Sequence, residues 1–168
     1  NIQRIKNGKI VDLTGDIVII NYDVLGKWVD ILMNHKFQVI IFDESHYLKN
    51  QKAQRTQHAQ HIAEVVPKKI LLTGTPILNR PNELFQQLRI INPAEFHDKA
   101  FFQFAKRYCD AKQVYVGGRK GYAWDFSGAS NTQELHEKLK HMVIRRTKDQ
   151  VLKELPDKRR TTLEFEIM

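Results

Sequence analysis

The chain has a single cysteine, Cys109, among its 168 residues. One cysteine excludes an internal disulfide framework and a cysteine-based zinc site, and it is typical of a reducing compartment. No apolar run approaches the roughly 20 residues that a membrane helix needs, and no signal peptide opens the chain. We therefore expect an intracellular protein with no membrane partner, in the cytoplasm or nucleoid of a bacterium or the nucleus of a eukaryote.

A second absence concerns nucleotide binding. No segment has the pattern Gly-x-x-x-x-Gly-Lys-Ser/Thr, the loop whose backbone N–H groups cradle phosphates. Gly26-Lys27 is followed by Trp28 and has no glycine five residues earlier. A phosphate-handling site in this chain would therefore be part of a larger ATPase.

The composition fits a folded domain with a basic surface. A length of 168 residues and a hydrophobic content of 42% are enough for one domain with a substantial core. The net charge of +8 and the isoelectric point near 9.6 favour a polyanionic partner, because Lys and Arg neutralise phosphates when nucleic acids bind. The alternative is a basic surface that is merely solvated.

Three short runs of β-branched residues predict strands at Asp16–Asn21, Gln38–Asp43 and Lys69–Leu72. Each run is apolar at successive positions and is flanked by polar residues. Because successive strand residues face opposite sides, we expect strands buried on both faces, as in a parallel sheet. Between the second and third runs, apolar residues at helical spacing predict a helix that ends at Pro67; they are Ala59, Ile62, Ala63 and Val66. The pattern predicts an α/β fold, a parallel sheet flanked by helices.

The second half of the chain has a different pattern. Leu84, Leu88 and Ile91 predict one helix, which Asn92-Pro93 ends. Further helices are expected over the aromatic-rich 96–108 and after a capping box at Ser130–Glu134, with a basic, glycine-rich loop at 117–121 between them.

These patterns predict three parts. Residues 1–92 form the α/β core, 93–147 a mainly helical insertion and 148–168 a closing segment that leads into a linker. At the two ends, 2–13 is expected to hold an edge strand with a turn at Asn7-Gly8, and 161–168 either a strand or part of that linker.

The acidic pair Asp43-Glu44 directly follows the apolar run 38–42. The carboxyl end of a parallel strand is where open α/β sheets bind ligands. There Asp43 can hold Mg²⁺, directly or through water, and Glu44 can polarise the water that attacks a γ-phosphate. His46 can sense the phosphate. The alternative is two solvated acids at a helix N-terminus, beside a surface histidine.

The sequence Thr73-Gly74-Thr75-Pro76 follows the next predicted strand. Its two hydroxyl groups are expected near the acidic pair, where they can relay the state of the nucleotide to a nucleic-acid groove. The alternative is an ordinary strand-to-helix turn, with Gly74 allowing a tight backbone and Pro76 fixing φ.

Residues 43–50, Asp-Glu-Ser-His-Tyr-Leu-Lys-Asn, resemble motif II of the Swi/Snf-type DNA-dependent ATPases of helicase superfamily 2. Residues 71–76 resemble motif III of that family, and Asn21-Tyr22-Asp23 resembles a tyrosine-containing motif that precedes these two in the chain. Arg145-Arg146-x-Lys148 is similar to the segment that closes the first motor lobe. Residues 107–112 and 124–128 are most like the annealing-helicase, fork-remodelling subgroup, so the resemblance covers nearly the whole chain.

The resemblance implies part of a RecA-like lobe of the phosphate-loop NTPase type, which uses ATP and Mg²⁺ and acts on duplex or branched DNA. It also implies that the phosphate loop lies upstream of Asn1 and a second RecA-like lobe beyond Met168, so the isolated chain should not hydrolyse ATP. Two positions depart from the family pattern, Leu78 in place of Gln and Ser45 in place of the commoner Ala.

Candidates for DNA contact are polar or cationic residues in or near these motifs, namely Tyr22, Lys49, Asn79, Arg119, Lys120, Arg145 and Arg146. The last two can instead support the hinge between lobes. Aromatic residues interleaved with the charges of 99–121 can stack on exposed bases, but we expect Phe101, Phe104 and Tyr108 to be core.

Two other functions remain open from the sequence. A non-catalytic DNA-binding or scaffold module would keep the fold without hydrolysis. An RNA-directed helicase would share the Asp-Glu-x-His motif, although the resemblance of residues 93–160 to the Swi/Snf insertion argues against it.

Overall fold

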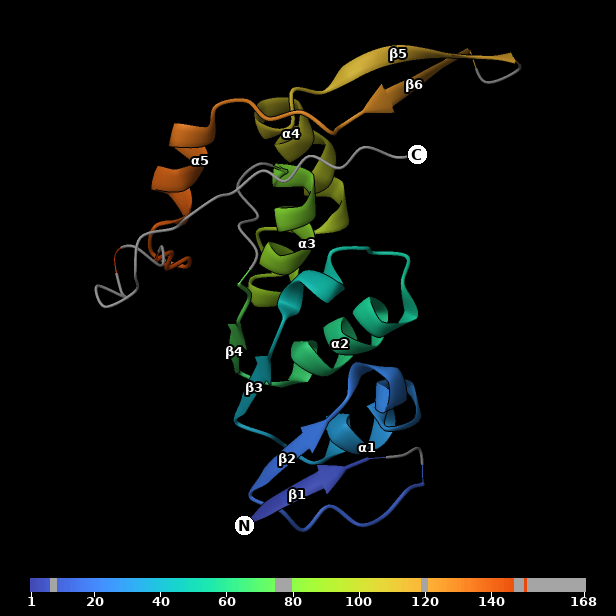
Figure 1. Cartoon of the computed structure of the whole chain (residues 1–168), viewed down its shortest axis with the longest axis vertical. Coiled ribbons are helices and arrows are strands. Elements are labelled where there is room, and N and C mark those ends of the chain that lie inside the picture. Colours follow the sequence, from blue (N-terminus) through green and yellow to red (C-terminus); the bar gives the residue numbers. More distant parts are fainter. Residues whose placement is uncertain (7–8, 75–79, 119–120, 147–149, 151–168) are drawn as a thin grey trace, which may run out of the picture. The chain divides into compact units, whose positions relative to one another are not determined.

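The computed structural model describes residues 1–6, 9–74, 80–118, 121–146 and 150 (Figure 1). They belong to two compact units, residues 1–132 and residues 133–168. The strands are β1 (Ile2–Ile5), β2 (Ile17–Ile20), β3 (Val39–Phe42), β4 (Lys68–Leu71), β5 (Lys112–Gly117) and β6 (Gly121–Asp125). The α-helices are α1 (Val29–Asn34), α2 (Gln54–Val65), α3 (Pro81–Ile91), α4 (Asp98–Tyr108) and α5 (Thr132–Leu139), with 3₁₀ turns at Tyr22–Lys27 and Ser45–Leu48.

The strands of the first half pair in parallel. β1 pairs with β2, Ile2 opposite Ile17, and β3 pairs with β4, Val39 opposite Lys68. Helix α2 connects β3 to β4, so the predicted strand–helix–strand unit is present, with each strand within one or two residues of its expected position. Among the described residues these strands form two separate parallel pairs rather than one continuous sheet.

The core of the first half is built on helix α2. Its predicted apolar stripe, Ala59, Ile62 and Ala63, is buried and packs in one cluster with Trp28 and Leu48. The helix ends at Val65, and Val66 is extended because a residue before proline disfavours the helical conformation. Phe42 at the end of β3 belongs to this cluster, and Leu71 at the end of β4 packs against it, so the core holds both strand ends in place.

The strands are not buried on both faces, contrary to the sequence-based prediction. Ile17 and Ile41 keep 55% and 58% of their surface exposed, whereas Phe42 is buried against the core. Successive strand residues point to opposite faces, and among the described residues the helical core covers one face of each strand pair. The apolar runs correctly predicted strands, but a continuous run does not reveal which elements cover each face.

The predicted helices of the second half are present. Helix α3 begins with Pro81 in its first turn, where a missing N–H costs nothing, and ends before Asn92. Phe85 of α3 packs against Phe104 of α4 at 5.0 Å between ring centroids, and Tyr108 packs against Phe104 at 5.0 Å. The expectation that Phe104 and Tyr108 are core residues is confirmed, and Phe101 is partly buried.

No strand was predicted in 93–147, yet β5 and β6 form an antiparallel hairpin there. They flank the predicted glycine-rich loop, and Gly117, Gly118 and Gly121 have positive φ angles that favour glycine. Every residue of β5 but the last is exposed, and burial in β6 alternates only between intermediate and exposed residues, so neither strand has a buried apolar face.

The helix start expected at Ser130–Glu134 is present, since α5 begins at Thr132, and the Ser130 side chain itself bonds to the end of α4. The Ser130 hydroxyl donates to the Arg107 carbonyl at 2.8 Å and accepts from the Asp110 N–H at 3.1 Å. It therefore closes the C-terminal end of α4. A serine hydroxyl satisfies whichever unpaired helix-end group lies nearest, and spacing alone does not say which end that is.

Several predicted features lie outside the described residues: the turn at Asn7-Gly8, the segment Thr75–Asn79, Arg119-Lys120, Lys148 and residues 161–168. Within the described residues, no helix is both long and apolar enough to cross a membrane.

Candidate functional site

The acidic pair lies in the loop that leaves β3. Glu44 has a left-handed backbone, with φ 47° and ψ 47°, and its N–H donates to the Asp43 carboxylate at 2.9 Å. A left-handed conformation costs a residue with a side chain roughly 1–2 kcal/mol. Such strained positions gather at functional sites.

Main-chain hydrogen bonds fix this loop against the end of β4. The Ser45 N–H donates to the Leu72 carbonyl at 2.8 Å, and the Leu72 N–H donates to the Phe42 carbonyl at 2.9 Å. The acidic loop and the segment that enters Thr73-Gly74 are therefore held side by side.

Tyr22 supports the acidic loop from the 3₁₀ turn after β2. Its hydroxyl donates to the Asp43 carbonyl at 2.8 Å, and its ring lies parallel to that of Phe42 with centroids 6.5 Å apart. Burial, and to a smaller degree the charge of Asp43, raises the pKa of Tyr22 to about 12. The phenol therefore stays protonated and remains a donor at physiological pH.

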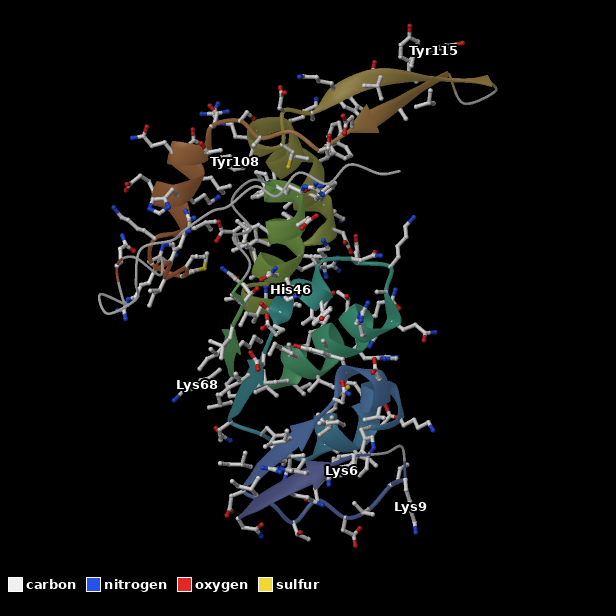
Figure 2. The ribbon with its side chains drawn as sticks, in the orientation of Figure 1. Lys6, Lys9, His46, Lys68, Tyr108 and Tyr115 are labelled. Carbon is white, nitrogen blue, oxygen red and sulfur yellow. The ribbon has the colours of Figure 1, made fainter. Side chains whose placement is uncertain are left out.

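His46 joins the acidic loop to the Thr-Gly turn (labelled in Figure 2). Its Nδ1 atom lies 3.2 Å from the Thr73 hydroxyl oxygen and 3.2 Å from a carboxylate oxygen of Glu44. A carboxylate only accepts hydrogen bonds, so this arrangement favours the tautomer with the proton on Nδ1. One imidazole N–H is then shared between Glu44 and Thr73.

Ser45 links the same loop to helix α3, a connection that the sequence analysis missed. Its buried hydroxyl donates to Oε1 of Gln87, which is also buried, at 3.1 Å. Among the described residues, Nε2 of Gln87 has no hydrogen-bond partner. The signal in the sequence was Gln87, a polar residue at helical spacing from Leu84 and Ile91 of the apolar stripe of α3.

The structure places the other predicted residues in different ways. Lys49 bonds both carboxylate oxygens of Glu83, at 3.2 and 3.3 Å. Arg145 and Arg146 are exposed in the second unit. Five more predicted residues lie outside the described residues: Thr75, Pro76, Asn79, Arg119 and Lys120.

The residues present fit a magnesium ion that arrives with phosphates. In the described part of the chain, no group of three or more His, Cys, Asp or Glu residues is arranged to hold a metal. Mg²⁺ usually binds through one or two carboxylates together with substrate phosphates and waters. The exposed carboxylate of Asp43 at a strand end suits that kind of site and not an all-protein cage.

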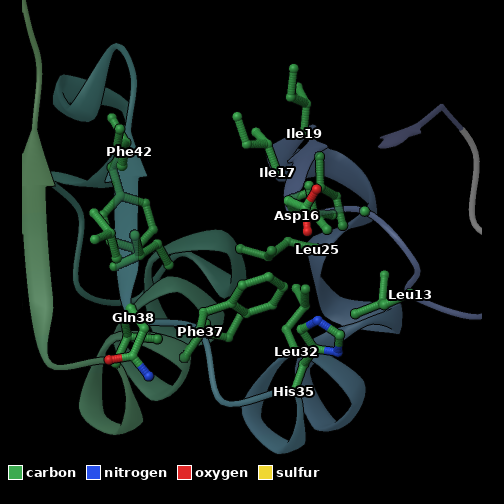
Figure 3. Close-up of a pocket in the computed structure, with 18 of the residues that line it drawn as sticks. Leu13, Asp16, Ile17, Ile19, Leu25, Leu32, His35, Phe37, Gln38 and Phe42 are labelled. Carbon is green, nitrogen blue, oxygen red and sulfur yellow. The ribbon is translucent and has the colours of Figure 1, made fainter. Parts of the chain in front are cut away.

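A cavity of about 850 Å³ lies along β2 and β3 (Figure 3). Its lining is mostly aliphatic and aromatic, including Ile17, Ile19, Leu25 and Phe37, and Asp43 is among the few charged residues that touch it. An apolar lining does not suit a triphosphate, so we do not assign nucleotide binding to this cavity.

Comparison with known proteins identifies the family. The profile of the SNF2-related domain matches residues 2–167. The chain belongs to the SNF2-related domain family. The resemblance inferred from motifs II and III is therefore confirmed.

Relatives of this SNF2-related domain include annealing helicases. It is 40% identical over 167 residues to the DNA annealing helicase and endonuclease ZRANB3 of Bos taurus, covering 99% of this chain and 15% of that protein. It is 45% identical over 145 residues to the SWI/SNF-related matrix-associated actin-dependent regulator of chromatin subfamily A-like protein 1 homolog of Caenorhabditis elegans, covering 86% of this chain and 20% of that protein. The chain thus spans only 15% to 20% of the length of these two relatives.

The fold also matches a solved structure, the Sulfolobus solfataricus SWI2/SNF2 ATPase core in complex with dsDNA. The TM-score is 0.58 at 23% sequence identity, over 79% of this chain and 25% of that one. The mixed α/β fold of this SNF2-related domain is therefore that of part of a SWI2/SNF2 ATPase core.

Proposed function

We propose that this SNF2-related domain is part of the first RecA-like lobe of a motor that couples ATP hydrolysis to DNA remodelling or reannealing. The observation that carries the proposal is the contact of His46 with both Glu44 and Thr73. It joins the acidic loop after β3 to the turn after β4. A motor needs such a connection if ATP hydrolysis is to change its affinity for DNA.

The residues divide the chemistry between them. Asp43 presents a carboxylate for Mg²⁺, which when bound neutralises charge on the β- and γ-phosphates. Glu44 is half exposed and accepts from the His46 N–H, so its carboxylate is oriented and still open to a water molecule. We assign Glu44 to orient and polarise the attacking water, and His46 to report the position of Glu44 to Thr73 and Gly74.

The rest of the motor lies outside this sequence. The sequence has no phosphate loop, and the chain spans a minor part of the relatives that it matches. We expect the remainder of the polypeptide to supply the phosphate loop and a second lobe, so the isolated chain should be inactive. The exposed faces of β2 and β3 agree with a lobe that has further elements to add.

The DNA-binding part of the proposal rests on the relatives and on charge. One relative is named a DNA annealing helicase, and the structural neighbour was solved with dsDNA. Lys49 is already paired with Glu83, and the Tyr22 hydroxyl with Asp43. The cationic residues that remain as candidates for phosphate contact are Arg119, Lys120, Arg145 and Arg146.

The test is Glu44→Gln in the full-length protein. It should leave ATP affinity unchanged, because the amide keeps the shape, and lower DNA-stimulated hydrolysis by about 10²–10⁴-fold, as expected when an acid or base that acts on the reacting group is lost. Glu64→Gln is the matched control, since Glu64 is an exposed glutamate of α2, and it should hydrolyse at the wild-type rate. Wild-type turnover by Glu44→Gln would remove Glu44 from its role.

The same assay separates the rival functions. Hydrolysis should rise with duplex or forked DNA and not with RNA. Stimulation by RNA alone would indicate an RNA-directed helicase, and full-length wild-type protein that binds DNA without hydrolysing ATP would indicate a scaffold.

A further inference from the structure

The β5–β6 hairpin carries an aromatic face. Paired residues of two strands lie on the same side of the ribbon, so Tyr115 with Tyr122, and Gln113 with Trp124, share one face. The rings of Tyr115 and Tyr122 lie 5.5 Å apart and keep 70% and 68% of their surface exposed. In Figure 2 the Tyr115 side chain points away from the ribbon.

Helix α4 extends this surface at the base of the hairpin. Phe102 packs edge-on against Trp124 at 5.1 Å, and each keeps about two fifths of its surface exposed. Trp124 is also stacked on Phe126 at 6.2 Å, with only 4° between the ring planes. We call Phe102, Tyr115, Tyr122 and Trp124 the aromatic face.

Fold stability does not require so much exposed aromatic surface. Phe101, Phe102 and Phe126 anchor the base of the hairpin through ring contacts at 5.3 and 6.4 Å. The two tyrosines lie further along the strands, toward the glycine-rich turn. Tyrosines exposed to this extent beside other rings are typical of a binding surface rather than a core.

Cations accompany the rings. The Lys106 ammonium lies 4.7 Å from the Phe102 ring centroid and 5.8 Å from that of Trp124. Within the described residues Lys106 has no ion pair with a carboxylate, whereas Lys112 is bonded to Asp110 at 2.6 Å. Residues 98–125 hold six cationic and three acidic residues.

We infer that the aromatic face binds unpaired bases of a DNA strand by stacking, with Lys106 close to the strand's phosphates. Exposed rings beside a cation such as Lys106 are the combination that single-stranded nucleic acids favour. A blunt duplex offers phosphates but keeps its base faces stacked, so this surface selects DNA with unpaired arms. The inference rests on the proposed function only for the presence of DNA.

The experiment measures equilibrium binding by the full-length protein, without nucleotide, so that it does not depend on hydrolysis. The probes are a labelled thymidine oligonucleotide, a forked duplex with unpaired arms and a blunt duplex of the same length. Tyr115→Ala/Tyr122→Ala should weaken binding to the oligonucleotide and the fork by about tenfold or more, since one stacked base contributes roughly 1–3 kcal/mol and tenfold is about 1.4 kcal/mol. Binding to the blunt duplex should change less than twofold.

Two further variants test the chemistry. Tyr115→Phe/Tyr122→Phe keeps the rings and should bind all three probes like the wild type. Lys106→Gln should weaken binding to the oligonucleotide. It should also reduce the slope of log affinity against log salt concentration by the amount expected for one lost phosphate contact. The thermal unfolding midpoint of each variant should equal that of the wild type. An unchanged midpoint shows that the substitution alters the surface and leaves the fold intact.

Several outcomes would overturn the inference. They are unchanged binding of the oligonucleotide by the alanine variant, equal weakening on the blunt duplex, or a change of oligomeric state, which would make the face a contact between copies of the chain. A failed Glu44→Gln test would leave this result untouched, because binding is measured without ATP.

Discussion

His46 and Thr73 lie within hydrogen-bond distance, 3.2 Å from Nδ1 to Oγ1, although 27 positions separate them in the chain. The same imidazole nitrogen lies 3.2 Å from the Glu44 carboxylate. One titratable ring thus contacts both the loop proposed to hydrolyse ATP and the turn proposed to respond to it. Coupling between two sites requires a physical element that both can bias, and this ring is the nearest candidate.

Thr73→Val should reduce the stimulation of hydrolysis by DNA while leaving basal hydrolysis close to the wild-type rate. A hydrogen bond of this kind contributes about 0.5–1.5 kcal/mol, so we expect a loss of stimulation between about twofold and tenfold. The measurement is the steady-state ATPase rate of the full-length protein with and without DNA.

Thr73→Ser keeps the hydroxyl and serves as the control, with stimulation like that of the wild type. Combining Thr73→Val with His46→Ala should add nothing to the loss of stimulation seen with His46→Ala alone, because both remove the same contact. Additive losses would show that the two residues act separately.

The sequence predicted the local elements well because each has its own period or end signal. The spacing of Ala59, Ile62 and Ala63 predicted α2, and Pro67 and Pro81 marked where one helix stops and another starts. Strand β3 and the acids after it were equally clear, since an apolar run followed by Asp43-Glu44 is a local pattern.

What the sequence did not predict depends on contacts between distant residues. Gln87 meets Ser45 across 42 positions, and nothing at either site indicates the partner. The β5–β6 hairpin was missed because neither strand has a buried residue: β5 is exposed at every position but its last, and β6 alternates only between intermediate and exposed residues. Ile17 and Ile41 were wrongly expected to be buried. Whether a strand face is buried depends on which other elements pack against it, and the residues of the strand do not reveal that.

Tyr22→Phe should destabilise the protein by about 1 kcal/mol at neutral pH, since it removes the donor to the Asp43 carbonyl. It should also remove a pH dependence of the unfolding free energy that is due to Tyr22. The pKa of Tyr22 is raised from 10 to about 12, so above pH 10 the folded protein keeps a proton that the unfolded chain releases. This contribution to stability is complete below pH 10 and is lost as the pH rises toward 12.

The measurement is urea unfolding of the wild type and of Tyr22→Phe at several pH values from 7 to about 11. The difference in unfolding free energy should be constant up to about pH 10 and then shrink. Tyr47→Phe is the control for the substitution itself, because Tyr47 is an exposed tyrosine of the neighbouring 3₁₀ turn, and at neutral pH it should leave the unfolding free energy close to the wild-type value. A difference that stays constant to pH 11 would contradict the assignment.

Ser45→Ala should destabilise the protein even though alanine is the commoner residue expected at this position of the motif. The Ser45 hydroxyl is the donor to Oε1 of the buried Gln87, whose Nε2 has no partner among the described residues. Leaving a buried acceptor unpaired costs about 1–3 kcal/mol, and the cost should appear as a lower midpoint of urea unfolding with an unchanged slope.

The decisive comparison is Ser45→Ala combined with Gln87→Met. Replacing both partners of a buried hydrogen bond with apolar groups of similar shape is nearly neutral, so the double variant should recover most of the stability that Ser45→Ala loses. Gln87→Met alone leaves the Ser45 hydroxyl, itself fully buried, without its acceptor and should also destabilise. If the double variant is instead less stable than either single one, the two side chains contribute independently. The link between the acidic loop and α3 would then rest on packing rather than on this hydrogen bond.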